Sequence, residues 1–232
     1  MIDKAPILIT GIPRSGASMI AQAIHICGAF GGVMSNKRGM FENDRIRDTV
    51  IKSYLNLIGV DDQGQFPLTG HLEHPWIPSD FRQRVDGVME SEGYKKGLWM
   101  YKDSRIPLMY RVWQYAYPDA KLIIVRRRTG DITQSCIKTA YMNAYKVGGR
   151  GLVNQTLTEE EGWLQMVHKY EELFIEIINS GVNCKVVWPE RMMYGDYKQL
   201  YETLDWVGLT WRSEILNVID PLFLSSRQKE RR

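Results

Sequence analysis

The stretch from Ile7 to Ala29, ILITGIPRSGASMIAQAIHICGA, constrains the fold of this chain more than any other. It begins with a short apolar run that stops at Gly11 and predicts a buried strand. Apolar residues then recur at helical spacing until Gly28, which predicts a helix. A helix that opens directly from a loop points unpaired backbone N–H groups and its positive dipole end at one place. We therefore expect the loop between strand and helix to bind an anionic group such as a phosphate.

This loop resembles the nucleotide-binding motif GxxxxGK[ST], because Gly11 and Gly16 have the required separation and Ser18 stands at the hydroxyl position. Ala17 replaces the lysine that would reach the β- and γ-phosphates, so hydrolysis of ATP or GTP is disfavoured. Arg14 is the cation of the loop instead, and it favours a ligand with a shorter anionic tail. The residues expected to hold that ligand are Pro13, Arg14, Ser15, Gly16, Ala17 and Ser18. The alternative is a turn that uses glycine only for backbone freedom.

Length and composition limit the class of protein. The chain has 232 residues, which suits one domain with a sizeable core or one domain with a small helical appendage. No apolar run approaches the roughly 18 residues of a membrane span. The formal net charge of +3 is compatible with an anionic ligand and does not require nucleic acid. Three cysteines without a CxxC spacing indicate neither a disulfide framework nor a zinc site. The first strand is predicted close to the first residue, so we expect no secretory leader and a cytoplasmic protein.

Three further apolar runs predict strands at Leu98–Tyr101, Lys121–Val125 and Cys184–Trp188. The run KLIIV is of the kind that parallel sheets bury on both faces. Helices are predicted at 42–58, 79–92 with Ser79 as the N-cap, 106–117, 129–145, 158–179 with a capping box, 194–207 and 211–219. This alternation predicts an α/β fold of three layers, in which helices cover both faces of a central parallel sheet of four to five strands.

Polar residues follow two of the predicted strands, where ligands of open α/β sheets bind. The segment KDSR, Lys102 to Arg105, follows one strand, and the arginines 126–128 follow KLIIV. A helix then begins at Thr129 and carries Ser135 in its early turns. We expect a second anion-binding junction here, with three solvated surface arginines as the alternative.

The two junctions together resemble those of sulfotransferases that use 3′-phosphoadenosine 5′-phosphosulfate. The segment ITGIPRSGAS is similar to the PRSGTT loop of tyrosylprotein, bacterial and carbohydrate sulfotransferases, and LIIVRRRTGDITQS keeps the family's arginine followed eight residues later by a serine. KDSR resembles the family's KDPR segment, RGMFEN at Arg38–Asn43 resembles a segment of bacterial members, and WVGL resembles the closing FLGL region. The resemblance covers most of the chain and implies a nucleotide-binding-loop fold of the sulfotransferase type.

The resemblance also implies a reaction, the transfer of a sulfuryl group to an acceptor hydroxyl or amine. Arg14, the loop amides and Ser18 would stabilise the charge that accumulates on the bridging oxygen, with Lys102 as a second cation. Arg127 and Ser135 would hold the 3′-phosphate, with Arg126 as the alternative to Arg127. Glu42 is the expected base that removes the acceptor's proton. The alternative for Glu42 is a first-turn glutamate that stabilises a helix dipole.

Several questions stay open at this level. The acceptor is a small molecule, a carbohydrate or a peptide, and we expect its contacts in 59–97, an irregular and helical insertion, and in 146–158. His71 and His74 lack a third ligand at a recognisable spacing, so we expect no metal. We expect a mobile tail at 221–232, and the oligomeric state stays open. The competing functions are a nucleotide or small-molecule kinase and a nucleotide-binding module without catalysis.

Overall fold

A parallel sheet of four strands forms the centre of the computed structural model, which describes residues 2–35, 39–66, 76–146, 148 and 157–219. The strands are β1 (Ile7–Gly11), β4 (Met100–Lys102), β5 (Lys121–Val125) and β6 (Cys184–Val187), in the order β4-β1-β5-β6. Each neighbouring pair is parallel. The predicted α/β fold with a central parallel sheet is confirmed.

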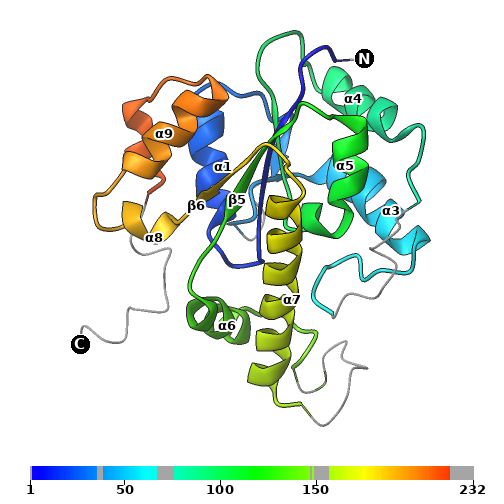
Figure 1. Ribbon diagram of the computed structural model, residues 1–232, viewed down its shortest axis with the longest axis vertical. Helices are drawn as coiled ribbons and strands as arrows, with labels where there is room; N and C mark the ends of the chain where they lie inside the picture. The colour runs from blue at the N-terminus through cyan, green and yellow to red at the C-terminus, as the bar shows by residue number, and fades with distance from the viewer. Residues whose placement is uncertain (1, 36–38, 67–75, 147, 149–156, 220–232) are drawn as a thin grey trace.

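Helices cover both faces of the sheet, because successive strand side chains point to opposite faces and both sets are apolar. Ile7 and Ile9 belong to one hydrophobic cluster, together with residues of helices α1 (Ala17–Ile26) and α9 (Lys198–Val207). Leu8 belongs to a second cluster on the opposite face. That cluster includes residues of α3 (Lys52–Leu57), α4 (Phe81–Ser91), α5 (Tyr110–Ala116), α6 (Thr129–Lys138) and α7 (Glu159–Asn179). In Figure 1, α1 and α9 accordingly lie on one side of β5 and β6, and α3, α4 and α5 on the other.

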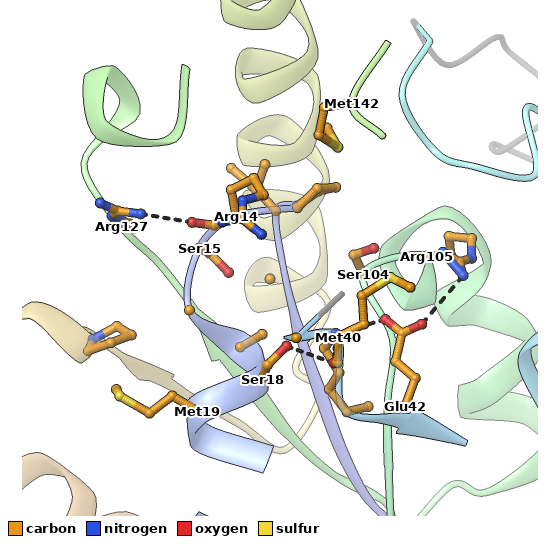
Figure 2. A pocket seen from close by; sticks show the side chains of 18 of the residues that line it. Arg14, Ser15, Ser18, Met19, Met40, Glu42, Ser104, Arg105, Arg127 and Met142 are labelled. Carbon is orange, nitrogen blue, oxygen red and sulfur yellow. Dashed lines mark hydrogen bonds and ion pairs between the residues drawn. The ribbon is translucent and has the colours of Figure 1, made fainter. Parts of the chain in front are cut away.

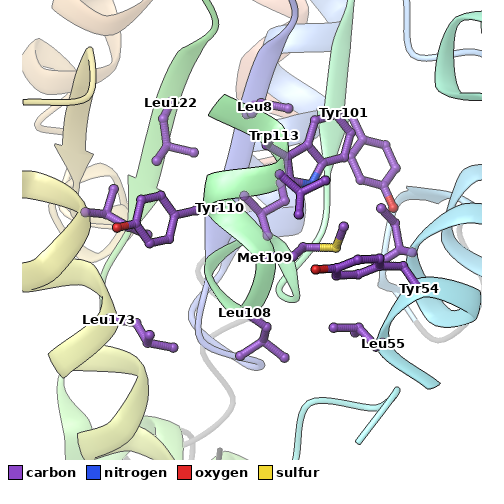
Figure 3. Close-up of a cluster of buried hydrophobic side chains, with 14 of the residues drawn as sticks. Leu8, Tyr54, Leu55, Tyr101, Leu108, Met109, Tyr110, Trp113, Leu122 and Leu173 are labelled. Atoms are coloured by element: carbon purple, nitrogen blue, oxygen red, sulfur yellow. The ribbon is translucent and has the colours of Figure 1, made fainter. Parts of the chain in front are cut away.

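Aromatic side chains fill the larger cluster, part of which Figure 3 shows. Trp113 of α5 stacks on Tyr101 of β4 at a centroid distance of 5.3 Å, and its edge meets Phe81 of α4 at 5.0 Å. Removing a buried aromatic side chain of this size typically costs about 3–5 kcal/mol. The packing therefore fixes β4, and with it the KDSR segment that follows, against two helices.

The predicted helix over 42–58 was wrong at its start. Glu42 and Asn43 form a short strand, β3 (Glu42–Asn43), which pairs antiparallel with β2 (Met34–Ser35). The helical part follows as α2 (Asp44–Ile46), a π-helical turn η2 (Arg47–Ile51) and α3. The reason is local, since the side chain of Asn43 accepts a hydrogen bond from Ile46 N at 2.9 Å and so caps the helix one residue after Glu42. Glu42 is therefore not a first-turn residue.

Other helix boundaries also differ from the predictions. Helix α4 has Asp80, not Ser79, at its N-cap position. The segment 106–117 begins as the 3₁₀ turn η4 (Ile106–Met109), and 211–219 holds only the 3₁₀ turn η5 (Ser213–Asn217). A short helix, α8 (Pro189–Met192), lies between the strand predicted at Cys184–Trp188 and the helix predicted at 194–207, and that later helix, α9, begins four residues late. The capping box before α7 is confirmed, with Thr158 and Glu161 bonding reciprocally.

The helix predicted over 129–145 ends early, and this matters for the site. It stops at Lys138, after which Gln65 holds the chain in a loop. Gln65 Oε1 accepts from the backbone N–H groups of Asn143 at 3.2 Å and Ala144 at 3.3 Å. Gln65 Nε2 donates to the carbonyl oxygen of Tyr141 at 3.2 Å. A side chain more than seventy positions earlier in the sequence therefore satisfies the backbone groups that a longer helix would have paired.

Candidate active site

The expected site residues lie around one cavity at the carboxyl ends of β1, β4 and β5. The cavity has a volume of about 480 Å³. The expected residues that line it are Pro13, Arg14, Ser15, Gly16, Ala17, Ser18, Glu42, Lys102 and Arg127. Figure 2 shows how several of them surround it. Ser135, the one expected residue outside this lining, is buried and bonds to Arg14.

The loop between β1 and α1 has the backbone shape that an anion site needs. Arg14 and Gly16 both have positive φ angles, of 76° and 95°, and α1 begins without a side-chain cap or an acidic residue in its first turn. Gly11 has no room for a side chain, because a Cβ atom there would lie 2.3 Å from Ser15 Oγ. That hydroxyl is itself buried and has no hydrogen-bond partner among the described residues. The loop therefore offers unpaired donors to a ligand.

Arg14 connects the two anion-binding motifs. Its Nε donates to Ser135 Oγ at 3.0 Å, and its Nη1 donates to Tyr141 Oη at 2.9 Å. Arg127 Nη1 in turn donates to the carbonyl oxygen of Arg14 at 3.1 Å, as the dashed line in Figure 2 shows. Two segments more than a hundred residues apart in the sequence thus meet at one point of the cavity.

The two candidate arginines after β5 have different surroundings. Arg127 is 5% exposed and lines the cavity. Arg126 forms an ion pair with Glu171 of α7 and lies over the ring of Trp188, 5.2 Å from its centroid. Arg126 is not among the cavity residues. This geometry favours Arg127 over Arg126 as the residue that binds an anion.

Glu42 and Lys102 form a buried ion pair, with Lys102 Nζ 2.7 Å from Glu42 Oε1. Arg47 Nη1 and Arg105 Nη2 approach the other carboxylate oxygen, Oε2, at 3.5 Å and 3.8 Å. Burial by itself raises the pKa of Glu42, but the positive charges of Lys102, Arg105 and Arg47 outweigh it and leave the pKa of Glu42 below its ordinary value. Glu42 is therefore a carboxylate at neutral pH, and its buried Oε2 has no hydrogen-bond partner among the described residues.

The carbonyl oxygen of Met40 accepts two hydrogen bonds in the same region. Ser18 Oγ donates to it at 2.7 Å and Lys102 Nζ at 2.8 Å. The neighbouring Phe41 has a positive φ of 47°, which is uncommon for a residue with a large side chain. Ser18 and Lys102, which are expected to contact a sulfuryl or phosphate oxygen, thus already donate to an oxygen atom of the chain itself.

Several residues of the cavity were not named from the sequence, among them Tyr141, Gln65 and Arg47. Tyr141 and Gln65 join the loop after α6 to the site, yet neither lies in a recognisable motif. Arg47 lies five residues after Glu42, a spacing that carries no signal for two residues on a strand and a π-helical turn. Arg105, by contrast, stands in the KDSR segment, whose position at a strand end was the signal.

Two further expectations concern a metal site and a membrane span, and some of the residues involved are not described. His71, His74 and the tail 221–232 lie outside the described residues, as do Arg38 and most of 146–158. Within the described ranges, no group of three or more His, Cys, Asp or Glu side chains has the arrangement of a metal site. None of the helices described is both long and apolar enough to span a lipid bilayer.

Comparison with known proteins supports the fold. No protein-family profile and no curated protein sequence matches the chain. Among solved structures, sulfotransferase STF9 from Mycobacterium avium is similar over 97% of this chain and 69% of its own, with a TM-score of 0.57 and 15% sequence identity. The chain has the sulfotransferase fold.

Two other solved sulfotransferases share this fold. STF1 from Mycobacterium tuberculosis H37Rv is similar over 94% of this chain and 71% of its own length, with a TM-score of 0.55 and 13% sequence identity. The sulfotransferase domain of the Synechococcus PCC 7002 olefin synthase is similar over 97% of this chain and 81% of its own length, with a TM-score of 0.52 and 14% sequence identity. At such identities the likeness concerns the backbone fold, so the roles of individual side chains rest on the geometry described above.

Proposed function

We propose that this protein is a sulfotransferase that moves a sulfuryl group from 3′-phosphoadenosine 5′-phosphosulfate to an acceptor hydroxyl or amine. The donor molecule supplies an activated sulfur atom, whose bond to the bridging oxygen breaks as a bond to the acceptor oxygen or nitrogen forms, the electron pair leaving with the 5′-phosphate. The remaining tasks fall to the side chains of the cavity: to bind two anionic groups, to stabilise the charge on the leaving oxygen and to take one proton.

The observation that carries the proposal is the contact between Arg14 and Ser135, at 3.0 Å, across two separate strand-to-helix junctions. Each junction alone is compatible with one phosphate. Arg14 and Arg127 line one cavity, and Ser135 lies next to it through its bond to Arg14, which supports two anion sites a short distance apart. Such a pair of sites suits a nucleotide with phosphate groups at both the 3′ and the 5′ position. The unpartnered hydroxyl of Ser15 fits the same ligand, because it leaves a buried donor available.

We assign the roles as follows. Arg127 and Ser135 bind the 3′-phosphate, while the amides of the loop, Ser15 and Ser18 bind the 5′-phosphosulfate. Arg14 bridges the two groups, and Lys102 donates to the oxygen on which negative charge accumulates. For Ser18 and Lys102, this requires that a ligand oxygen replaces the Met40 carbonyl.

Glu42 receives the proton of the acceptor. Its Oε2 has unused acceptor capacity and belongs to the lining of the cavity. Its lowered pKa keeps it deprotonated, which a base requires, although the same shift makes it a weaker base than an ordinary glutamate. Lys102, at 2.7 Å, holds the carboxylate in place.

Ligand-induced stabilisation tests the binding half of the proposal. The bisphosphate product, 3′,5′-bisphosphoadenosine, should stabilise the fold, while ATP should do so much less, because Ala17 replaces the lysine that holds the β- and γ-phosphates. At a hundredfold excess over its Kd a ligand contributes about 2.7 kcal/mol, or roughly 5–10 °C in a chain of this size. Equal shifts with ATP would favour a kinase and contradict the proposal.

Transfer itself requires a second measurement. The protein is incubated with donor carrying a radioactive sulfur and with a panel of hydroxyl and amine acceptors, and labelled product is separated by chromatography. Label that appears in an acceptor supports the proposal. Binding of bisphosphoadenosine without transfer to any acceptor would instead indicate a nucleotide-binding module without catalysis.

A further inference from the structure

We propose that the acceptor is a polar hydroxyl compound with a negative charge of its own, an acidic sugar in the simplest case, and that Arg105 binds that charge. This inference rests on the proposed sulfuryl transfer, because it concerns the second substrate of the same cavity. It follows from the side chains that surround Glu42, from their charge, and from the unused hydrogen-bonding capacity of Arg105.

Charged side chains surround Glu42, with Lys102, Arg47 and Arg105 at 2.7, 3.5 and 3.8 Å from its carboxylate oxygens. Met40 lies beside them, and the lining of the cavity also includes the polar residues Lys52, Gln63, Gln65 and Ser104. Tyr141 is the one aromatic residue among all the described residues that line the cavity. An apolar acceptor such as a sterol or a simple phenol would displace water from these polar groups without replacing its hydrogen bonds, and this desolvation is costly. The lining therefore suits an acceptor rich in hydroxyl groups.

The charge of this lining is strongly one-sided. Three of its cations, Arg14, Lys102 and Arg127, have roles toward the sulfuryl donor. Arg47, Lys52 and Arg105 remain at the acceptor end, and Glu42 is the one acidic residue among the described residues of the lining. The other carboxylates that pair with these cations are Asp44, Asp48 and Asp103, and they do not belong to the lining. The cavity thus presents its positive groups to the acceptor.

Of the three cations at the acceptor end, Arg105 is the one with a buried donor that lacks a hydrogen-bond partner among the described residues. It is 5% exposed, and the donor is its Nε. Its nearest carboxylate oxygens are Asp103 Oδ1, 3.3 Å from Nε, and Glu42 Oε2, 3.8 Å from Nη2. The Nε–H group thus makes no hydrogen bond although two carboxylates lie close to the guanidinium, and a buried donor left without a hydrogen bond is costly. A carboxylate or sulfate group of the acceptor can accept two parallel hydrogen bonds from this guanidinium.

The same distances limit the size of the acceptor. The reacting hydroxyl must lie within a hydrogen bond of Glu42 Oε2, and the anionic group within a hydrogen bond of Arg105, whose Nη2 is 3.8 Å from that oxygen. With two hydrogen bonds of about 2.8 Å, hydroxyl and anion are separated by at most about 9 Å. Such a separation fits groups on one sugar ring or on adjacent rings.

Matched acceptor pairs test this inference. Methyl β-D-glucuronide is compared with methyl β-D-glucoside, and N-acetylglucosamine 6-sulfate with N-acetylglucosamine, so that the members of each pair differ in one anionic group. Affinity is measured by calorimetry on protein saturated with 3′,5′-bisphosphoadenosine. We expect the charged member to bind about tenfold or more tightly in at least one pair, because hydrogen bonds to charged groups have this strength. The preference should fall as salt is added.

Variants then assign the preference to Arg105. Arg105→Lys keeps the charge but loses the planar fork, so the charged-over-neutral ratio should fall several-fold. Because Arg105 is buried, each variant is first checked for its unfolding temperature and for unchanged affinity for bisphosphoadenosine. Lys52→Met is a milder variant at the same end, since Lys52 is partly exposed and pairs with Asp48 at i,i+4. It should lower the ratio about threefold at moderate salt, the scale of one partly screened charge.

Lys198→Met is the matched control for Lys52→Met. Lys198 also pairs at i,i+4 on a helix, with Glu202, but it is 82% exposed and lies outside the cavity lining. It should leave the ratio unchanged. Equal affinities within both pairs, in protein that binds bisphosphoadenosine normally, would overturn the anionic acceptor and leave the sulfotransferase proposal intact. Failure to bind bisphosphoadenosine would instead overturn the proposed function.

Discussion

The two ends of the cavity are built differently. The end that we propose binds the sulfuryl donor, the donor end, consists of two strand-to-helix junctions. Arg14 and Ser15 lie in the loop between β1 and α1, and Arg127 lies between β5 and α6. The side chains of the donor end are joined largely by hydrogen bonds to hydroxyl and carbonyl groups. At the end proposed for the acceptor, Glu42 is held by buried ion pairs, one of them with Lys102, which comes from a separate strand and lies between the two ends.

This difference has consequences for substitutions. Removing a hydroxyl or a guanidinium from the donor end takes a ligand contact away but leaves no charge buried without a partner. Removing one member of the Glu42–Lys102 pair leaves the other charge buried and unpaired, which typically costs about 3–5 kcal/mol. The donor end should therefore report on binding, and the acceptor end on catalysis and stability together.

The largest effect is expected at Glu42. Glu42→Gln should lower turnover about 10²- to 10⁴-fold, because proton removal from the acceptor then falls to water. The affinity for bisphosphoadenosine should stay unchanged, since of the two proposed substrates Glu42 contacts only the acceptor. Turnover is measured at saturating donor, and donor affinity by calorimetry.

Glu176→Gln is a control for the Glu42 variant. Glu176 also pairs with an arginine, Arg111 at 2.9 Å, but on the partly exposed surface of α7 and outside the cavity lining. It should change neither rate nor affinity. Turnover of Glu42→Gln within about threefold of the wild type would remove Glu42 from the mechanism.

A smaller effect is expected at the donor end. Arg127→Ala should erase the preference for bisphosphoadenosine over adenosine 5′-monophosphate, because it removes charge-assisted bonds worth about 1.5–3 kcal/mol, or more than tenfold in affinity. Arg126→Ala is the neighbouring control and should preserve that preference, since Arg126 pairs with Glu171 away from the cavity. The reverse result in the same binding assay would assign the 3′-phosphate to Arg126.

The smallest effect is expected in how the free energy of unfolding depends on pH. The pKa of Glu42 is lowered in the folded protein from its ordinary value of 4.5, so its contribution to stability is present above that value and is lost as pH falls through the lowered pKa. The stability difference between the wild type and Glu42→Gln should therefore be largest near pH 7 and shrink well below pH 4.5. Urea unfolding at both pH values measures it. A difference that grows in acid would contradict the assigned charge of Glu42.

Much of the donor end was readable from the sequence, because its chemistry is local. A strand, a loop and a helix in succession determine where backbone N–H groups point, and Gly11 and Gly16 mark the loop through steric demands that act within a few residues. The parallel sheet was predictable for a similar reason. Apolar runs such as KLIIV indicate strands that are buried on both faces of a sheet. The alternation of such strands with helices is compatible with few sheet topologies.

The tertiary structure alone decided the rest. Arg126 and Arg127 could be told apart only by the fold, which places Glu171 of α7 beside Arg126 and leaves Arg127 at the cavity. The early end of α6 depended on Gln65, and the charge state of Glu42 on Lys102 and Arg105. Each is an interaction between residues far apart in the sequence, where ion pairing and desolvation depend on distances of a few ångströms. Local sequence patterns determine secondary structure and loop shape, but such distances are set by how the elements pack.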